Sequence, residues 1–123
     1  AYAACCLFAD AQVGRLLDAL DQSPIAKNTI IVLWSDHGFH LGEKDHIEKF
    51  VLWEKANHVP FIISAPGIGT HGARCETPVD LTVLYPTLLD LCGIKNRSYY
   101  DGKSALPLLI NPKAKWDHPA IST

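Results

Sequence analysis

One short run of apolar, β-branched residues constrains the fold of this chain more than any other feature. Residues 29–34 (TIIVLW) hardly alternate between polar and apolar positions, which is typical of a strand buried on both faces of a parallel sheet. A second run, residues 61–64 (FIIS), predicts another buried strand. The polar stretch between them, residues 35–49, follows the carboxyl end of the first strand. Because ligand sites of open α/β sheets form beyond such ends, we expect a functional site there.

Helical patterns surround both runs. Residues 3–21 place apolar side chains at helical spacing, and residues 81–92 do the same before Gly93, which suits a C-terminal cap. Residues 50–57 indicate a short helix, and residues 106–109 are expected to lie in a loop. The order helix, strand, loop, helix, strand, helix predicts an α/β fold with a mostly parallel sheet flanked by helices.

Composition excludes two classes of partner. The 123 residues carry 11 Lys and Arg against 13 Asp and Glu, a net charge of -2. Proteins that bind nucleic acid through counterion release need a basic excess, so we expect no nucleic-acid partner. No apolar run approaches the roughly 18 residues of a membrane-spanning helix, so we expect no membrane span.

The chemically informative stretch is residues 35–43 (SDHGFHLGE), followed by Lys49. Asp36 and His37 lie side by side where the chain leaves a buried strand, so both side chains can reach one point. A carboxylate oxygen and an imidazole nitrogen make a mixed ligand pair for a divalent ion. Lys49 is a compact positive charge that could meet a sulfate or phosphate. From these residues alone, a turn-capping Asp, a surface His and a solvated Lys remain open interpretations.

The sequence around this stretch resembles the sulfatase family of the alkaline-phosphatase-like superfamily. The resemblance rests on three segments in the family's order: residues 35–43 (SDHGFHLGE), 48–56 (EKFVLWEKA) and 58–67 (HVPFIISAPG). Three flanking segments agree with it: residues 10–17 (DAQVGRLL), 84–93 (LYPTLLDLCG) and 101–104 (DGKS). The sequence resembles most the iduronate-sulfatase-like and choline-sulfatase-like groups within the family. The resemblance covers nearly the whole chain.

The resemblance implies a fold, a metal ion and three residue roles. It implies an alkaline-phosphatase-like (sulfatase) α/β fold, of which residues 1–123 form an internal to carboxy-terminal part of the catalytic domain. Asp36 and His37 match the pair that gives two ligands to a calcium ion. Lys49 matches the lysine that contacts the substrate sulfate and stabilises its charge in the transition state. In the same loop, Glu43 is expected to order the chain and His46 to line the pocket.

The resemblance also implies a nucleophile that this sequence does not carry. The family's formylglycine is made from the Cys of a C-x-P-S-R motif, and Cys5 and Cys6 are followed by Leu7 and Phe8 instead. We therefore expect the amino-terminal part of a longer enzyme to supply the nucleophile and further acidic metal ligands. The isolated segment is expected to bind calcium poorly and to be inactive as a sulfuric ester hydrolase.

Two other functions remain open. One is a phosphoester hydrolase of the same superfamily, in which the Asp-His pair binds zinc, and the other is a non-catalytic α/β binding module. The L-G-E sequence after Gly38, together with Lys49, favours the sulfatase. Its substrate would be a sulfated small molecule or a sulfated glycan, and the oligomeric state is open. The family alone suggests a periplasmic, secreted or lysosomal location.

Overall fold

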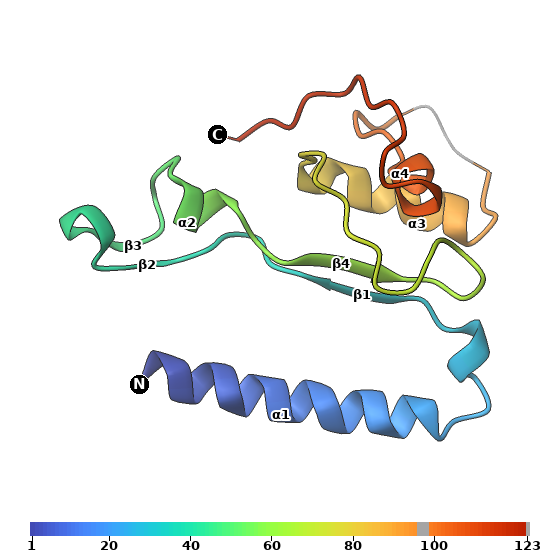
Figure 1. The fold of residues 1–123 in the computed structure, drawn as a ribbon, viewed down its shortest axis with the longest axis horizontal. Coiled ribbons are helices and arrows are strands. Elements are labelled where there is room, and N and C mark those ends of the chain that lie inside the picture. Colours follow the sequence, from blue (N-terminus) through green and yellow to red (C-terminus); the bar gives the residue numbers. More distant parts are fainter. Residues whose placement is uncertain (96–98, 123) are drawn as a thin grey trace. The chain divides into compact units, whose positions relative to one another are not determined.

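The computed structural model describes residues 1–95 and 99–122 and divides into two compact units, residues 1–30 and 31–123. The first unit consists of helix α1 (Tyr2–Asp21) and a single 3-10 turn (Ala26–Asn28), which agrees with the helix predicted from residue 3 to residue 21 (Figure 1). In the described structure α1 buries none of its side chains. Among the described residues no helix is both long and apolar enough to span a membrane.

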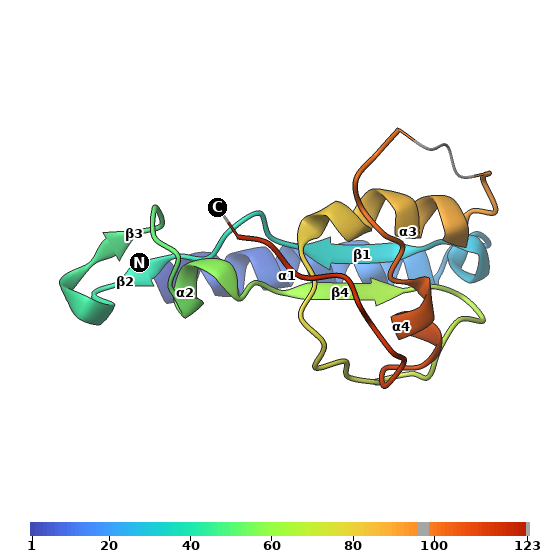
Figure 2. The same ribbon diagram turned by 90° about the horizontal axis from the view of Figure 1, so that it is seen from above.

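The second unit is built on a two-stranded ribbon. Strand β1 (Ile31–Trp34) pairs with strand β4 (Phe61–Ser64), so both predicted strands are present. They run antiparallel, with Ile31 opposite Ser64, so the described ribbon does not show the mostly parallel sheet that the sequence predicts. A parallel pair is usually joined by a crossover helix, whereas residues 35–60, which join these two strands, form a short hairpin and a four-residue helix. The chain returns alongside β1 in the opposite direction (Figure 2).

Within residues 31–95 and 99–122 only one face of β1 is covered, whereas the sequence predicts burial on both faces. Figures 1 and 2 show helices α3 (Leu84–Leu91) and α4 (Leu106–Ile110) over one face of the ribbon. On the other face the cross-strand pair Leu33 and Ile62 is 45% and 56% exposed. An apolar run locates a strand, but its burial depends on what covers each face.

The small core of the second unit joins α3 to α4. Val83 in the 3-10 turn Leu81–Val83 and Leu108 in α4 are buried, and Thr87 of α3 lies between them. Thr87 Oγ1 donates to the Val83 carbonyl at 2.6 Å and accepts from the Ala105 N–H at 2.8 Å. One hydroxyl therefore links the start of α3 to the start of α4.

Helix α4 corrects the loop expected over residues 106–109. Pro107 occupies its first turn, where a missing N–H costs nothing because that turn has no intrahelical acceptor. The predicted cap of α3 is present. Gly93 adopts a φ of 66°, and the Ile94 N–H donates to the Leu89 carbonyl at 2.9 Å, the hydrogen bond of a Schellman ending.

A second, smaller hairpin occupies the polar stretch after β1. Strands β2 (His40–Leu41) and β3 (Ile47–Glu48) pair antiparallel around the 3-10 turn Glu43–Asp45. Helix α2 (Glu54–Asn57) follows, and it is shorter than the helix predicted over residues 50–57. This hairpin and α2 lie at the end of the ribbon where β1 finishes and β4 begins (Figure 1).

Candidate functional site

Asp36 and His37 occupy the turn that leaves β1. The His37 backbone N–H donates to Asp36 Oδ1 at 3.0 Å, and Ser35 Oγ donates to the His37 carbonyl at 2.7 Å. These bonds fix the turn while the Asp36 side chain stays 72% exposed. Asp36 Oδ2 lies 3.5 Å from His37 Nε2, so a carboxylate oxygen and an imidazole nitrogen face the same point.

The Lys49 side chain also reaches His37 Nε2, although Lys49 follows strand β3 and His37 precedes strand β2. Lys49 Nζ lies 2.6 Å from His37 Nε2. The other ring nitrogen, Nδ1, lies 2.8 Å from the Gly38 carbonyl, which can only accept, so Nδ1 carries the proton and Nε2 presents a lone pair. The structure thus brings together the three side chains that the sequence singled out, although Lys49 lies 12 residues beyond His37 in the chain. Their roles as metal ligands and sulfate contact stay predictions.

Helix α2 closes tightly against the back of this turn. The Gly38 N–H donates to the Ala56 carbonyl at 2.7 Å, and Ala56 is buried. A Cβ at position 38 would lie 1.9 Å from the Lys55 carbonyl oxygen, so only glycine fits. The Asp-His-Gly sequence is therefore explained by geometry: two side chains project forward because the third residue lets a helix pack behind them.

The hairpin between His37 and Lys49 has an unusual backbone. Lys44, Asp45 and Glu48 have φ values of 57°, 56° and 101°, in the left-handed region that non-glycine residues rarely adopt. Glu43 Oε2 accepts from the Leu41 N–H at 2.8 Å, and this hydrogen bond lowers the pKa of Glu43. That contact agrees with the expectation that Glu43 orders the loop.

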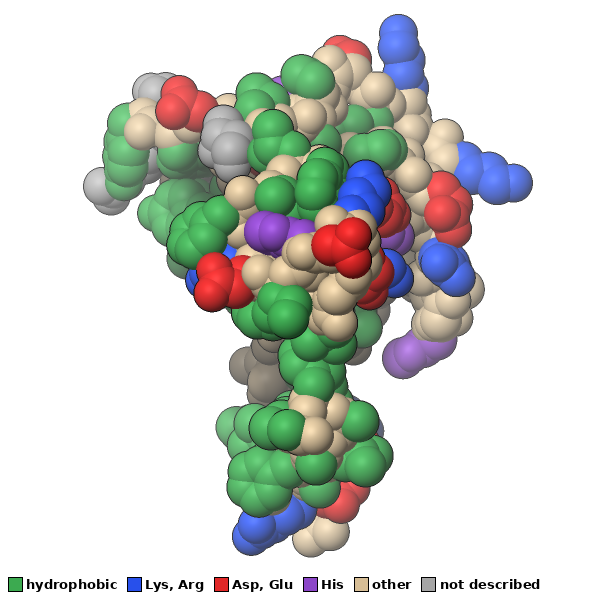
Figure 3. Space-filling view, turned by 90° about the vertical axis from the view of Figure 1, so that its left-hand side faces the viewer, with side chains coloured by type: hydrophobic (Ala, Val, Ile, Leu, Met, Phe, Trp, Pro, Cys, Tyr) green, Lys and Arg blue, Asp and Glu red, His purple; other side chains and the backbone are tan. Residues whose placement is uncertain are grey.

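Sequence reasoning missed the packing beneath the hairpin. His40 is only 1% exposed, and its ring lies 5.5 Å from that of His46 and 5.4 Å from that of Trp53, between centroids. The available signal was the even separation of His40 and His46 across a short hairpin, which places both on one face. Figure 3 looks onto the hairpin end of the chain, where histidine, lysine and acidic side chains gather among hydrophobic ones.

The donor atoms fit one part of a cation site. Asp36 offers an exposed carboxylate oxygen, the ligand type that calcium prefers. The lone pair of His37 Nε2 faces Lys49 Nζ at 2.6 Å in this structure, so His37 can bind an ion only when Lys49 moves away from that nitrogen. Within residues 1–95 and 99–122 no group of three or more His, Cys, Asp or Glu side chains could hold a metal ion. Because calcium takes about six to eight ligands, a complete site would need donors beyond these two.

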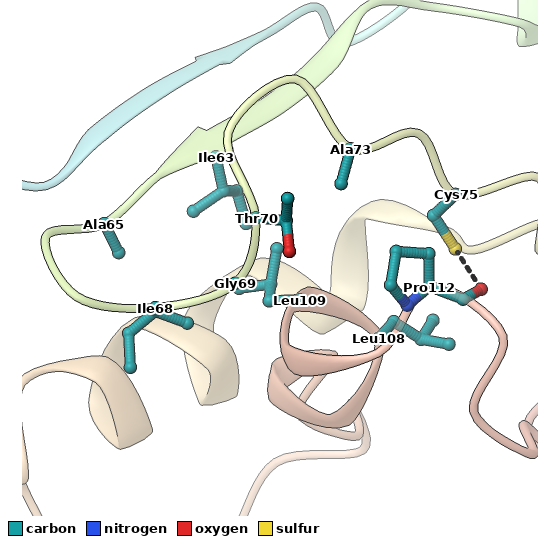
Figure 4. Close-up of a pocket in the computed structure, with 10 residues that line it drawn as sticks. All are labelled: Ile63, Ala65, Ile68, Gly69, Thr70, Ala73, Cys75, Leu108, Leu109 and Pro112. Carbon is teal, nitrogen blue, oxygen red and sulfur yellow. Dashed lines mark hydrogen bonds between the residues drawn. The ribbon is translucent and has the colours of Figure 1, made fainter.

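A separate pocket lies between the end of β4 and α4 (Figure 4). It encloses about 100 Å³ and is lined mainly by apolar side chains, among them Ile63, Ile68 and Leu109. Ligand pockets usually enclose about 300 Å³ or more, and the three candidate site residues do not line this one. The pocket is therefore not the predicted site.

With this geometry in view, comparison with known proteins decides the family. The sequence model of the sulfatase family matches residues 1–94. The chain belongs to the sulfatase family. It is 44% identical over its whole length to a sulfatase of Formosa agariphila, and 36% identical over 107 residues to human arylsulfatase K. This sulfatase-family chain spans 24% and 20% of those two relatives, about a quarter of their length or less.

Solved structures give the same result for the fold. One protein, solved with its substrate D-glucosamine-2-N,6-O-disulfate, matches 87% of this chain and 22% of its own, with a TM-score of 0.82 and 34% identity. A second, described as a 2-O GAG sulfatase, matches 90% of this chain and 25% of its own, with a TM-score of 0.71 and 33% identity. The fold of this sulfatase-family chain is thus shared with larger proteins.

Proposed function

We propose that the complete protein hydrolyses sulfate esters at the site that begins with Asp36, His37 and Lys49. The observation that carries the proposal is their convergence, with Lys49 Nζ 2.6 Å and Asp36 Oδ2 3.5 Å from His37 Nε2, in a chain of the sulfatase family. Membership alone would allow a non-catalytic module, but such a module has no need for three converging polar groups.

The chemistry needs positive charge at a fixed place. Cleavage of a sulfate ester builds negative charge on oxygen atoms, and groups that are already positioned stabilise it most. Lys49 supplies one positive charge, and the short distance from its Nζ to His37 Nε2 places that charge at the site proposed for the sulfate. A calcium ion bound by Asp36 and His37 would add Lewis-acid stabilisation of the sulfate oxygens.

Other parts of the machinery are proposed to lie outside these residues. This sequence has no C-x-P-S-R motif, so we propose that the formylglycine nucleophile belongs to the remaining part of the protein. The exposed Leu33 and Ile62 leave room for further strands or helices against the ribbon. We propose that the complete domain covers them and extends the ribbon into the mostly parallel sheet of the family.

We propose a sulfated saccharide as the substrate. One structural neighbour was solved with a disulfated glucosamine, another is described as a 2-O GAG sulfatase, and a relative from Formosa agariphila is an ulvan-active sulfatase that is 34% identical over 115 residues. These three similarities concern sulfated carbohydrates. They support a sulfated glycan, and the relatives named arylsulfatase K support an aryl sulfate as the second candidate.

Sulfate release by the complete protein tests this proposal. We expect turnover of a sulfated glucosamine and far less of the matching phosphate ester. The Lys49→Met variant should lose on the order of 100-fold or more in kcat, because one positioned charge is commonly worth that much. Lys55→Met is the matched control, since Lys55 is exposed on α2, and it should keep full activity. Equal activity of both variants, or preference for the phosphate ester, would refute the proposal.

A calorimetric titration tests the metal assignment separately. Calcium should bind the complete protein, and Asp36→Ala should weaken binding by more than about tenfold, because even partners outside the coordination shell cost that much. Parallel titration with zinc distinguishes the phosphoester-hydrolase alternative, whose pair would prefer that ion. Unchanged calcium affinity in Asp36→Ala would remove Asp36 from the metal site.

A further inference from the structure

We propose that the buried ring of His40, packed against the partly exposed rings of His46 and Trp53, forms a positioning cluster that sets the separation of Lys49 from His37. The inference rests on the proposed function, because it concerns the two residues assigned to the sulfate and the metal. None of the three rings has to touch the substrate. Their effect is exerted through the hairpin that carries both site residues.

The hairpin register is what fixes the two site residues against each other. His40 pairs with Glu48 across the hairpin. This pairing holds Lys49, the residue after Glu48, beside residues 38 and 39, which join His37 to His40. Lys49 therefore approaches His37 only while this register holds. A slip of one residue would turn the Lys49 side chain to the opposite face of the hairpin.

The three rings hold that register from one face. His40 pairs with Glu48 and the Gly42 N–H donates to the His46 carbonyl at 3.0 Å, so His40 and His46 are diagonal neighbours on the same face. The three ring pairs meet edge to face, with centroids 5.4 to 5.6 Å apart. This geometry is the favourable one for aromatic rings. Trp53 directly precedes α2, so the cluster also joins the hairpin to the helix behind Gly38.

The backbone supports the same conclusion. Lys44, Asp45 and Glu48 hold left-handed φ values, and such conformations persist only where the surroundings determine them. Glu48 is both the partner of His40 and the neighbour of Lys49. Lys44 Nζ lies 4.3 Å from the Trp53 ring centroid, so the turn itself rests on the cluster. In the described part of the chain, His40 is the only buried side chain of this hairpin, and it lies in the cluster.

The contribution of His40 comes from the shape of its ring. Within the described residues neither ring nitrogen of His40 has a hydrogen-bond partner, and Glu43 Oε2 is 3.8 Å away from Nδ1. A phenyl ring can therefore replace the imidazole, whereas a methyl group cannot. Ile47 offers a matched control, because it lies on the opposite face of the same hairpin and is 67% exposed.

The test compares His40→Ala, His40→Phe, His46→Ala and Ile47→Ala in the complete protein. The first measurement is the rate at which an acetylating reagent modifies Lys49, followed by mass spectrometry at neutral pH. The second is kcat and KM for sulfate release. We expect Lys49 acetylation to rise several-fold in both alanine variants of the cluster, with a matching fall in kcat/KM. His40→Phe and Ile47→Ala should stay at the wild-type values.

Three results would overturn the proposal. The first is unchanged Lys49 acetylation in a folded His40→Ala or His46→Ala protein. The second is a folded His40→Phe protein that behaves like His40→Ala, which would give the ring nitrogens a direct role. The third is an equal effect of Ile47→Ala. If the wild type releases no sulfate, the proposed function fails, but the acetylation rates still test the positioning cluster.

Discussion

At the scale of single residues, the Thr87 hydroxyl makes two buried hydrogen bonds that join separate parts of the chain. It is fully buried, donates to Val83 and accepts from Ala105. Thr87→Val keeps the shape but leaves the Ala105 N–H without an acceptor, so we expect a loss of about 1–3 kcal/mol in the free energy of unfolding. Urea unfolding of the complete protein measures it. Thr87→Ser keeps the hydroxyl and should lose clearly less; equal losses would show that the methyl group matters instead.

At the residue scale, residue type and position after a strand drew attention to Asp36, His37 and Lys49, but the roles given to them came from the family resemblance. The structure brings the three side chains together, and their roles stay predictions. His40 and Trp53 were not identified as partners, because a histidine in a polar loop reads as exposed. Its burial depends on a ring that lies 13 positions further along the chain.

At the scale of elements, the β2–β3 hairpin contains a strained backbone conformation at Glu48, whose energetic cost can be measured. Glu48 has a φ of 101°, which glycine adopts freely and a β-branched residue does not. We expect Glu48→Val to be less stable than Glu48→Gly by about 1–3 kcal/mol, measured by urea unfolding of the complete protein. At the neighbouring, exposed Ile47, whose φ is not positive, valine suits the strand better than glycine. Ile47→Val should therefore be more stable than Ile47→Gly. If valine were the better residue at both positions, the left-handed conformation of Glu48 would be wrong.

Elements were located more reliably than their partners. Apolar runs identified β1 and β4, and helical spacing identified α1 and α3. The antiparallel pairing of β1 with β4 was missed because both parallel and antiparallel strands can be continuously apolar. Helix α4 was missed because Pro107 lies in its first turn, Pro112 follows it, and five residues are too few for a periodic signal.

At the scale of the whole second unit, Asp80 joins parts that are distant in sequence. Its Oδ2 accepts from the Ile121 N–H at 3.1 Å, 41 residues away, and Oδ1 accepts from the Thr82 N–H and hydroxyl. Burial raises the pKa of Asp80, but these hydrogen bonds together outweigh it and hold the pKa below its ordinary value.

The lowered pKa of Asp80 gives a pH prediction with a definite sign. A carboxyl group whose pKa is lower in the folded state stabilises the fold above its unfolded pKa, about 3.9, and this stabilisation is lost as the pH falls through the folded value. Asp80→Asn should therefore be less stable than the wild type at neutral pH. The difference should shrink below about pH 4. Urea unfolding of both proteins across this range measures it, and a difference independent of pH would contradict the assignment.

The family assignment concerns a chain that spans about a quarter of its relatives, so the central claim is best tested in the complete protein. That claim is that Asp36, His37 and Lys49 form one shared cation and sulfate site. The most direct measurement is a crystal structure of the complete protein with calcium and a sulfated glucosamine. We expect Asp36 and His37 on the ion and Lys49 Nζ on the sulfate. An ion held without Asp36 and His37, or a sulfate bound away from Lys49, would contradict the account.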